Sequence, residues 1–161
     1  MNVFAVLIVL ALMLPAAPDT PMTTGSEACV SQADAERILG GSAQLLESKS
    51  EKIDGLHRRM CTFRSIKERQ SNLYYLIETY SDTTAANRAF DGIVKANRSM
   101  AGEELVDGIG DEAWRHSDRK NFSIIVFRKG RIMVRMKVNK LARSTSVVSF
   151  YEVARTIAST I

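Results

Sequence analysis

The chain has 161 residues, 45% of them hydrophobic and 25% charged, which suffices for one globular domain that buries its own core without metals or many disulfides. Its 22 basic and 18 acidic residues give a net charge of +4, and the basic residues are scattered along the chain. So mild an excess argues against a dedicated nucleic-acid site. We therefore expect a single domain that binds no nucleic acid.

Residues 1–17 bear on where the protein is located. Residues 3–14 are an unbroken apolar run, followed by Pro15 and two alanines. Such a run is too short to span a bilayer comfortably, which takes about 20 apolar residues, and it is typical of a secretory signal peptide. We expect an exported protein that is periplasmic, secreted or membrane-tethered. Because no Lys or Arg precedes the run and Pro18 follows it, three alternatives stay open: cleavage, retention as a membrane anchor, and a start of the segment further upstream.

Residues 18–28 are rich in Pro, Thr, Ser and Gly and predict a linker, so the domain is expected to span residues 29–161. The chain has two cysteines, Cys29 and Cys61, and an oxidising compartment would preserve a disulfide between them. The loop that it closes, of about 32 residues, implies a stabilisation of about 3 to 4 kcal/mol. The alternative is a metal site that adds His57 and His116, but it lacks the paired short spacings of structural zinc. We predict the disulfide and no metal.

Three segments show helical patterns. Ser31 can cap a short helix, with Asp34 three residues further on, and Gly40 ends it. Asp82 can cap a second helix that continues to about Met100, and a third runs from about residue 145 to residue 161. Their apolar faces are expected to pack on a sheet. These faces consist of Ala35, Ile38 and Leu39; of Ala86, Ala89, Phe90, Ile93 and Val94; and of Val147, Phe150, Ala154, Ile157 and Ile161.

The remaining segments predict an antiparallel sheet. The expected strands span residues 43–53, 56–63, 72–80, 121–127 and 132–138. Turns at Asp54-Gly55 and at Gly130 join strands into hairpins. In the last strand apolar and polar residues alternate, which predicts one buried and one wet face. We predict an α+β domain in which a mainly antiparallel sheet of about five to six strands is packed by about three helices.

Basic residues accompany the second hairpin. They are Arg128, Lys129, Arg131, Arg135 and Lys137. We interpret them as a solvated sheet face that resists aggregation, in preference to a binding patch for an acidic partner.

The segment from Gly108 to Trp114, GIGDEAW, begins with a match to the G-x-G-x-x-A dinucleotide pattern. Asp111 and Glu112 would oppose a pyrophosphate and no amphipathic helix follows, which excludes a dinucleotide site. The same acids lack the ligand spacing of a calcium loop. We predict a structural loop in which Gly108 and Gly110 permit a sharp bend. Asp111 and Glu112 then stay solvated or cap local amides, and Trp114 returns the chain to the core.

Several short motifs together resemble a known family. They are Cys29 before a short helix that ends at Leu39-Gly40, Cys61 in the string MCTF, the string VDGIGDEA at residues 106–113, and a hairpin with Arg128-Lys129-Gly130. The combination resembles small exported bacterial lipoproteins of unknown function that share a PsbP-like α/β sandwich. The resemblance implies an antiparallel sheet covered by helices and supplies no catalytic residues. Glu27 stands where a lipoprotein signal has a small apolar residue, so no lipid is expected on Cys29.

Candidate catalytic residues are few. His57 and His116 are the only histidines, each in a polar context, and no G-x-S-x-G turn is present. We predict no catalytic residue and no cofactor, and we expect a non-catalytic exported or envelope-associated module that binds an unknown protein or small ligand through its sheet face or loops. The alternative is a small secreted hydrolase or lyase with a dispersed active site. A concave pocket that holds either histidine beside a carboxylate and a hydroxyl would favour the enzyme.

Overall fold

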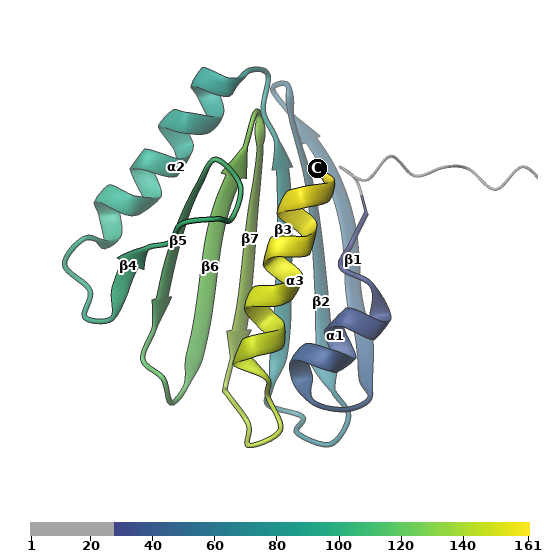
Figure 1. Cartoon of the computed structure of the whole chain (residues 1–161). Coiled ribbons are helices and arrows are strands. Elements are labelled where there is room, and N and C mark those ends of the chain that lie inside the picture. The colour runs from purple at the N-terminus through teal and green to yellow at the C-terminus, as the bar shows by residue number, and fades with distance from the viewer. Residues whose placement is uncertain (1–27) are drawn as a thin grey trace, which may run out of the picture.

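The computed structural model describes residues 28–161, which are built on one antiparallel sheet (Figure 1). Its strand order is β1-β2-β3-β7-β6-β5-β4. The strands are β1 (Ala43–Ile53), β2 (Leu56–Ser65), β3 (Asn72–Thr79), β4 (Glu103–Leu105), β5 (Glu112–Ser117), β6 (Phe122–Lys129) and β7 (Ile132–Asn139). The helices are α1 (Gln32–Leu39), α2 (Thr83–Asn97) and α3 (Val147–Thr160). The α+β prediction is confirmed, with seven strands in place of the expected five to six.

The sheet combines two antiparallel meanders, β1 to β3 and β4 to β7, which α2 connects. Strands β3 and β7 pair at the centre, where Tyr75 lies opposite Met136. Helices α1 and α3 cover the face that Figure 1 presents to the viewer, which we call the front face. Helix α2 packs on the opposite face, which we call the back face. The helices therefore flank the sheet in three layers.

Each face has its own apolar cluster. On the front face, Ile38 of α1 and Phe150 of α3 lie among the buried side chains of the central strands. On the back face, Phe90 of α2 packs with buried side chains of β5, β6 and β7, namely Trp114, Val126 and Met133. Burial of apolar area on both faces is what holds the helices to the sheet.

The second hairpin departs from the expected pattern of one buried and one wet face. Met133 and Val134 point to opposite faces, and both are 0% exposed. Arg128, predicted to lie on a solvated basic face, is only 6% exposed, and Lys129 points to the front face, where it donates a hydrogen bond to the carbonyl of Ala158. The predicted stripe is wrong at these two residues. Arg128 is enclosed by Asp111, Glu112 and Gly130, and Lys129 points to the face opposite to that of Arg128.

The predicted helix starts are confirmed. Ser31 and Asp82 accept hydrogen bonds from backbone amides at the starts of α1 and α2, and Gly40 ends α1 in the left-handed region with φ 73°. Helix α3 begins after Ser146. Val147 was expected to face the sheet but is 39% exposed, and the helix first becomes buried at Phe150.

Two strands escaped the sequence analysis. Strand β4 has only three residues, two of them glutamates, and pairs with β5 alone. The first three residues of β5 were assigned to the loop that ends at Trp114, and the last three to no element, since the sequence EAWRHS carries charged and polar residues at four of its six positions. Strand β4 is the edge strand of the sheet, where few apolar residues are needed, and β5 is its neighbour, with Ala113 and Trp114 as its only buried residues.

The predicted disulfide between Cys29 and Cys61 is present, with 6.0 Å between the two Cα atoms. It ties the segment before α1 to the middle of β2. Within residues 28–161 no three His, Cys, Asp or Glu side chains are grouped to hold a metal ion. None of the three helices in this part of the chain has the length and hydrophobicity of a transmembrane segment. The predicted signal or anchor at residues 1–17 lies outside the described residues.

Candidate functional site

A hollow of about 280 Å³ lies on the front face beside the disulfide, and we call it the His57 hollow. Its walls come from β1, β2 and β3. The lining residues are Ser50, Glu51, Lys52, His57, Arg58, Arg59, Ile77 and Thr79. The hollow therefore places His57, one of the two histidines considered as catalytic candidates from the sequence, in a concave site.

Two cross-strand rows form the floor of the His57 hollow. One row is Lys52, His57 and Thr79, and the other is Ser50, Arg59 and Ile77. Directly opposed residues of an antiparallel pair share a face, so all six side chains point to the front face, on which Ile77 is part of the core.

Glu51 and Arg58 alternate with these rows and point to the back face. Glu51 forms an ion pair with Lys49, and Arg58 forms one with Glu78. The only carboxylate residue of the lining is thus aimed away from His57. Within residues 28–161, no hydrogen bond joins the His57 ring to a carboxylate or to a hydroxyl, so a nucleophile, base and orienting acid are not assembled.

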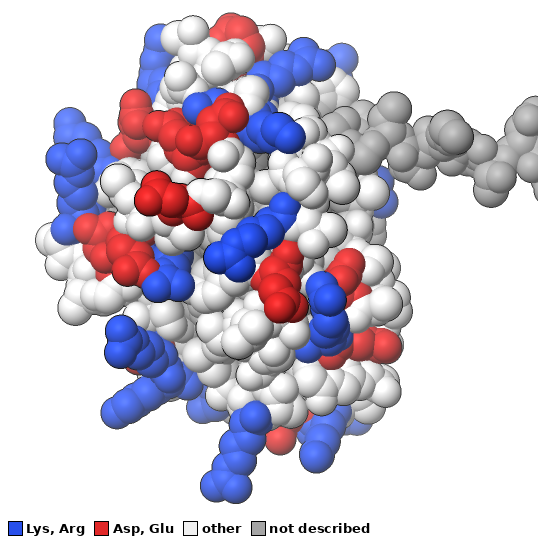
Figure 2. Space-filling view, in the orientation of Figure 1, with Lys and Arg blue, Asp and Glu red and all other residues white. Residues whose placement is uncertain are grey.

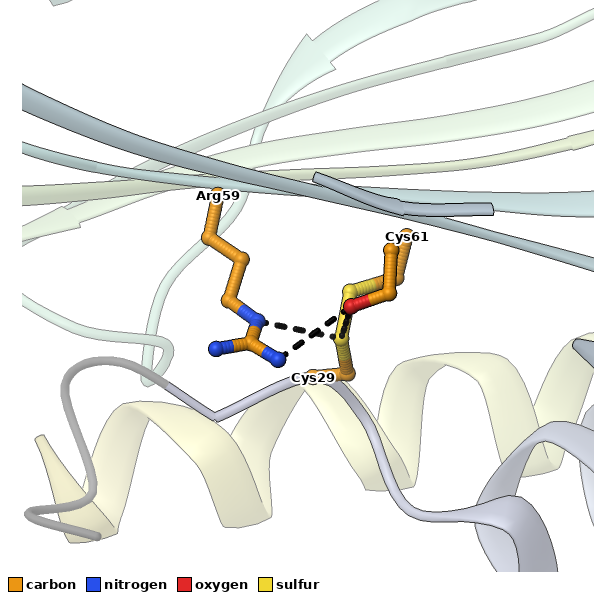
Figure 3. The surroundings of a disulfide bond; sticks show 4 residues. Cys29, Arg59 and Cys61 are labelled. Atoms are coloured by element: carbon orange, nitrogen blue, oxygen red, sulfur yellow. Dashed lines mark hydrogen bonds between the residues drawn. A yellow bond between two sulfur atoms is a disulfide. The ribbon is translucent and has the colours of Figure 1, made fainter. Parts of the chain in front are cut away.

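The side chain of Arg59 extends from β2 towards α3 and lies next to the disulfide (Figure 3). Its Nε donates to Cys29 Sγ at 3.4 Å, and its Nη2 donates to Ser48 Oγ at 3.2 Å. Neither Arg59 nor Lys52 forms an ion pair with a carboxylate of the described chain. Uncompensated cations in a hollow attract anions, and the Arg59 guanidinium is held in place by its two hydrogen bonds.

His116 lies elsewhere, on the back face of β5. Its Nε2 is 3.1 Å from the carbonyl oxygen of Ala101, and its ring packs edge-on against Phe122 with centroids 4.9 Å apart. The two histidines occupy opposite faces of the sheet, so they do not form a common site.

The predicted structural loop contains Gly110 with φ 65°. A Cβ at Gly110 would lie 2.4 Å from the carbonyl oxygen of Arg128, so this position combines a left-handed backbone with a close approach. Gly108 also has positive φ, 75°, but a Cβ there would meet nothing within 4 Å. Trp114 is 2% exposed, and its Nε1 donates to Glu103 Oε2 at 2.7 Å.

The acids of this loop do more than stay solvated, because they neutralise Arg128. The Arg128 Nη1 donates to Asp111 Oδ2 at 2.9 Å, and its Nε donates to Glu112 Oε2 at 3.0 Å. Asp111 Oδ2 also accepts from the backbone amide of Gly130 at 2.8 Å. The loop is therefore clamped to the second hairpin through a buried guanidinium.

The back face holds a second buried ion that the sequence analysis missed. Glu78 is 1% exposed, and its Oε1 accepts from Arg58 Nε at 3.1 Å and from Nη2 at 2.9 Å. Its Oε2 accepts from Arg135 Nη2 at 2.9 Å and from the Tyr80 hydroxyl at 3.3 Å. Burial, together with the Glu78 carboxylate, raises the pKa of Tyr80 above its ordinary value. Only the register of three strands brings these groups together, so no local sequence motif predicts this cluster.

The fold and the site define an α+β domain with one antiparallel sheet and a cationic surface hollow. Compared with models of known protein families and with curated proteins, the sequence matches none.

Proposed function

We propose that this protein is a non-catalytic exported module that binds a small anionic ligand in the His57 hollow. The observation that carries the proposal is that Lys52 and Arg59 face the hollow without a carboxylate partner in the described chain. The side chain of Glu51, which could have oriented His57 for acid–base chemistry, points to the other face. The hollow thus offers positive charge and hydroxyl groups for binding.

Export is supported by the disulfide, since cysteine pairs persist in oxidising compartments. The apolar run at residues 3–14 and the resemblance to PsbP-like envelope lipoproteins point the same way. Cell fractionation followed by N-terminal sequencing tests this part. Full-length protein in the cytosol with both thiols free would contradict it.

Ligand binding is tested with citrate as a small polyanionic probe, titrated into the oxidised protein and followed by backbone amide shifts in NMR spectra. We expect shifts in β1, β2 and β3 around the hollow. Lys52→Gln weakens citrate binding about threefold, the effect of one exposed charge. Lys49→Gln is the matched control, because it removes the same charge from the same strand but on the opposite face. Equal weakening by both variants would mean general attraction and no site.

A hydrolase or lyase remains the second candidate, because the Ser50 and Thr79 hydroxyls line the same hollow as His57. Hydrolysis of p-nitrophenyl acetate that is lost in both Ser50→Ala and His57→Gln would favour the enzyme. Activity that survives in either variant would argue against this hollow as an active site.

A further inference from the structure

The sheet end at which β2, β5 and β7 finish gathers three loops, residues 66–71, 118–121 and 140–146. They are neighbours because Asn139 lies opposite both Asn72 and Phe122 in the sheet register. The amide of Leu141 also donates to the carbonyl of Asn121 at 2.8 Å. We call these three loops the basic end.

The basic end carries most of the charge imbalance of the protein. Its basic residues are Lys67, Arg69, Arg119, Lys120, Lys140 and Arg143, against two acids, Glu68 and Asp118. The excess of four positive charges equals the net charge of the whole chain, +4. None of the six cations forms an ion pair with a carboxylate of residues 28–161. Figure 2 shows Lys and Arg side chains projecting from this lower end of the molecule.

Asp118 contributes little to neutralising these cations, because its carboxylate is occupied by its own turn. Its Oδ1 accepts from the amides of Lys120, Asn121 and Phe122, at 3.0, 2.7 and 3.0 Å. The Asn121 side chain and these amides hold the pKa of Asp118 far below its ordinary value.

A hollow of about 500 Å³ opens at the basic end, larger than the His57 hollow, and we call it the loop-end hollow. Its lining residues are Lys67, Glu68, Arg69, Gln70, Ser71, Lys140, Leu141 and Ala142. Three cations and one carboxylate give this lining a net charge of +2.

Ser71 is one of the lining residues of the loop-end hollow, and its hydroxyl group is enclosed and unpaired. The residue is 1% exposed, and its Oγ has no hydrogen-bond partner among the described residues. Its backbone is already committed, because the amide donates to the Glu68 carbonyl at 2.7 Å and the carbonyl accepts from the Ser65 amide at 3.0 Å. A buried hydroxyl without a partner is uncommon in folded proteins and costs free energy, so a ligand that shifts the enclosing loop 66–71 and accepts the hydroxyl proton would remove that cost.

Lys140 has φ 53°, in the left-handed region that residues other than glycine rarely adopt. The hydrogen bond of the following amide, from Leu141 to Asn121, holds the chain there. This geometry keeps Lys140 on the wall of the loop-end hollow, opposite the loop that carries Lys67 and Arg69.

We propose that the loop-end hollow binds a phosphate group, either as the free anion or on a lipid headgroup. A phosphate monoester carries about −1.5 to −2 charges at neutral pH, which matches the net charge of the lining. Its oxygens accept two parallel hydrogen bonds from an arginine such as Arg69, point-charge contacts from lysines, and a hydroxyl hydrogen bond from Ser71. The site is separate from the His57 hollow, which lies at the opposite end of β2.

The test is a titration of inorganic phosphate into the oxidised protein. Binding is measured by calorimetry and by backbone amide shifts in NMR spectra. We expect saturable binding with shifts in residues 66–71 and 140–142. Arg69→Gln weakens binding about tenfold, and Ser71→Ala weakens it about threefold or more. Because the Ser71 hydroxyl has no partner in the free protein, Ser71→Ala leaves the melting temperature unchanged or raises it. Lost affinity without lost stability therefore separates a binding role from a structural one.

Two matched controls locate the site. Arg143→Gln removes a charge from the same end but outside the lining, and Lys52→Gln removes one from the His57 hollow; we expect both to keep phosphate affinity within about twofold of the parent. Equal weakening by Arg143→Gln and Arg69→Gln, or an unchanged affinity in Ser71→Ala, would overturn the proposal. Because phosphate binding does not depend on the His57 hollow, failure of citrate binding and failure of phosphate binding are distinguishable.

The source of the phosphate group is resolved by sedimentation with phosphatidylcholine vesicles that contain phosphatidic acid. If the protein binds these vesicles, if inorganic phosphate competes with this binding and if Ser71→Ala weakens it, the ligand is a lipid headgroup. Binding of inorganic phosphate without vesicle binding indicates the free anion. Absence of both would overturn the proposal.

Discussion

Two buried ions on the back face of the sheet are neutralised in opposite ways. Across six strands, one register row consists of Glu51, Arg58, Glu78, Met133, Arg128 and Glu112. On one side of Met133, the buried carboxylate of Glu78 lies between two guanidiniums; on the other side, the buried guanidinium of Arg128 lies between two carboxylates. Met133 itself is fully buried and separates the two clusters.

In both clusters the central ion is buried and its partners are partly exposed. Glu78 has a side chain 1% exposed, against 33% for Arg58 and 36% for Arg135. The Arg128 side chain is 7% exposed, against 47% for Asp111 and 44% for Glu112. Because an exposed partner can return to water and a buried ion cannot, loss of the partners costs more than loss of the central ion.

The two clusters also join different parts of the fold. The partners of Glu78 lie on β2 and β7, so this cluster links three regular strands. The partners of Arg128 lie at the end of the loop before β5 and at the first residue of that strand, so this cluster fastens a loop to the hairpin. We therefore expect the Glu78 cluster to matter for global stability and the Arg128 cluster for the position of the loop.

The largest effect is expected when both cations are removed from Glu78. Arg58→Gln combined with Arg135→Gln leaves a buried carboxylate without an opposite charge, which lowers the free energy of unfolding by about 3 kcal/mol or more. Urea unfolding monitored by circular dichroism measures this change in the free energy of unfolding. Adding Glu78→Gln to the double variant is the control, and we expect it to restore most of the loss. A triple variant as unstable as the double one would contradict the role assigned to the buried charge.

The next largest effect concerns the backbone of the loop that Arg128 fastens. Gly110→Val forces a β-branched residue to φ 65° and brings its Cβ against the Arg128 carbonyl, at a cost of about 2 kcal/mol or more. Gly108→Val is the matched comparison, since its φ is also positive but its surroundings are open; it costs about 1 kcal/mol. Equal melting temperatures for the two variants would refute the close approach.

A smaller effect is expected from the carboxylates around Arg128. Asp111→Asn combined with Glu112→Gln removes both charges from around the guanidinium. Because these partners lie at the end of a loop, which can move and readmit water to Arg128, the loss of stability stays at about 1 kcal/mol, less than for the strand-borne partners of Glu78. Citrate binding in the His57 hollow stays unchanged. If calcium instead raises the melting temperature of the parent, and this rise is lost in the double variant, the loop is a metal site and the structural role that we assign to it is wrong.

The smallest effect comes from an exposed carboxylate, which completes the contrast with the buried Glu78. The pKa of Asp118 is lowered in the folded state, so its contribution to stability is present above the unfolded pKa of about 3.9 and is lost as pH falls through the lower folded value. Thermal melts of the parent and of Asp118→Asn across acidic pH are the measurement. We expect the parent to be the more stable near neutral pH and the difference to shrink below about pH 4; a constant difference would contradict this.

The sequence by itself determined the local features of this protein. The caps at Ser31 and Asp82, the turn at Asp54-Gly55 and the glycine that ends α1 each depend on residues within a few positions of one another. The disulfide followed from there being only two cysteines. Apolar periodicity then sufficed for the α+β class, because burial of such faces requires helices on a sheet.

Only the tertiary structure decided which charges meet and which faces are covered. The period-2 pattern of β7 separates Met133 from Val134, but it says nothing about the helices that cover both faces. Met133 is buried in the cluster of α2 on the back face, and Val134 is buried in the cluster of α1 and α3 on the front face. Glu78 and Arg135 are 57 residues apart and meet only because β3 pairs with β7. The same holds for Ser71 and Lys140, whose loops become neighbours through that pairing. Such contacts depend on strand order and register, which are set by the whole core and not by any local stretch of chain.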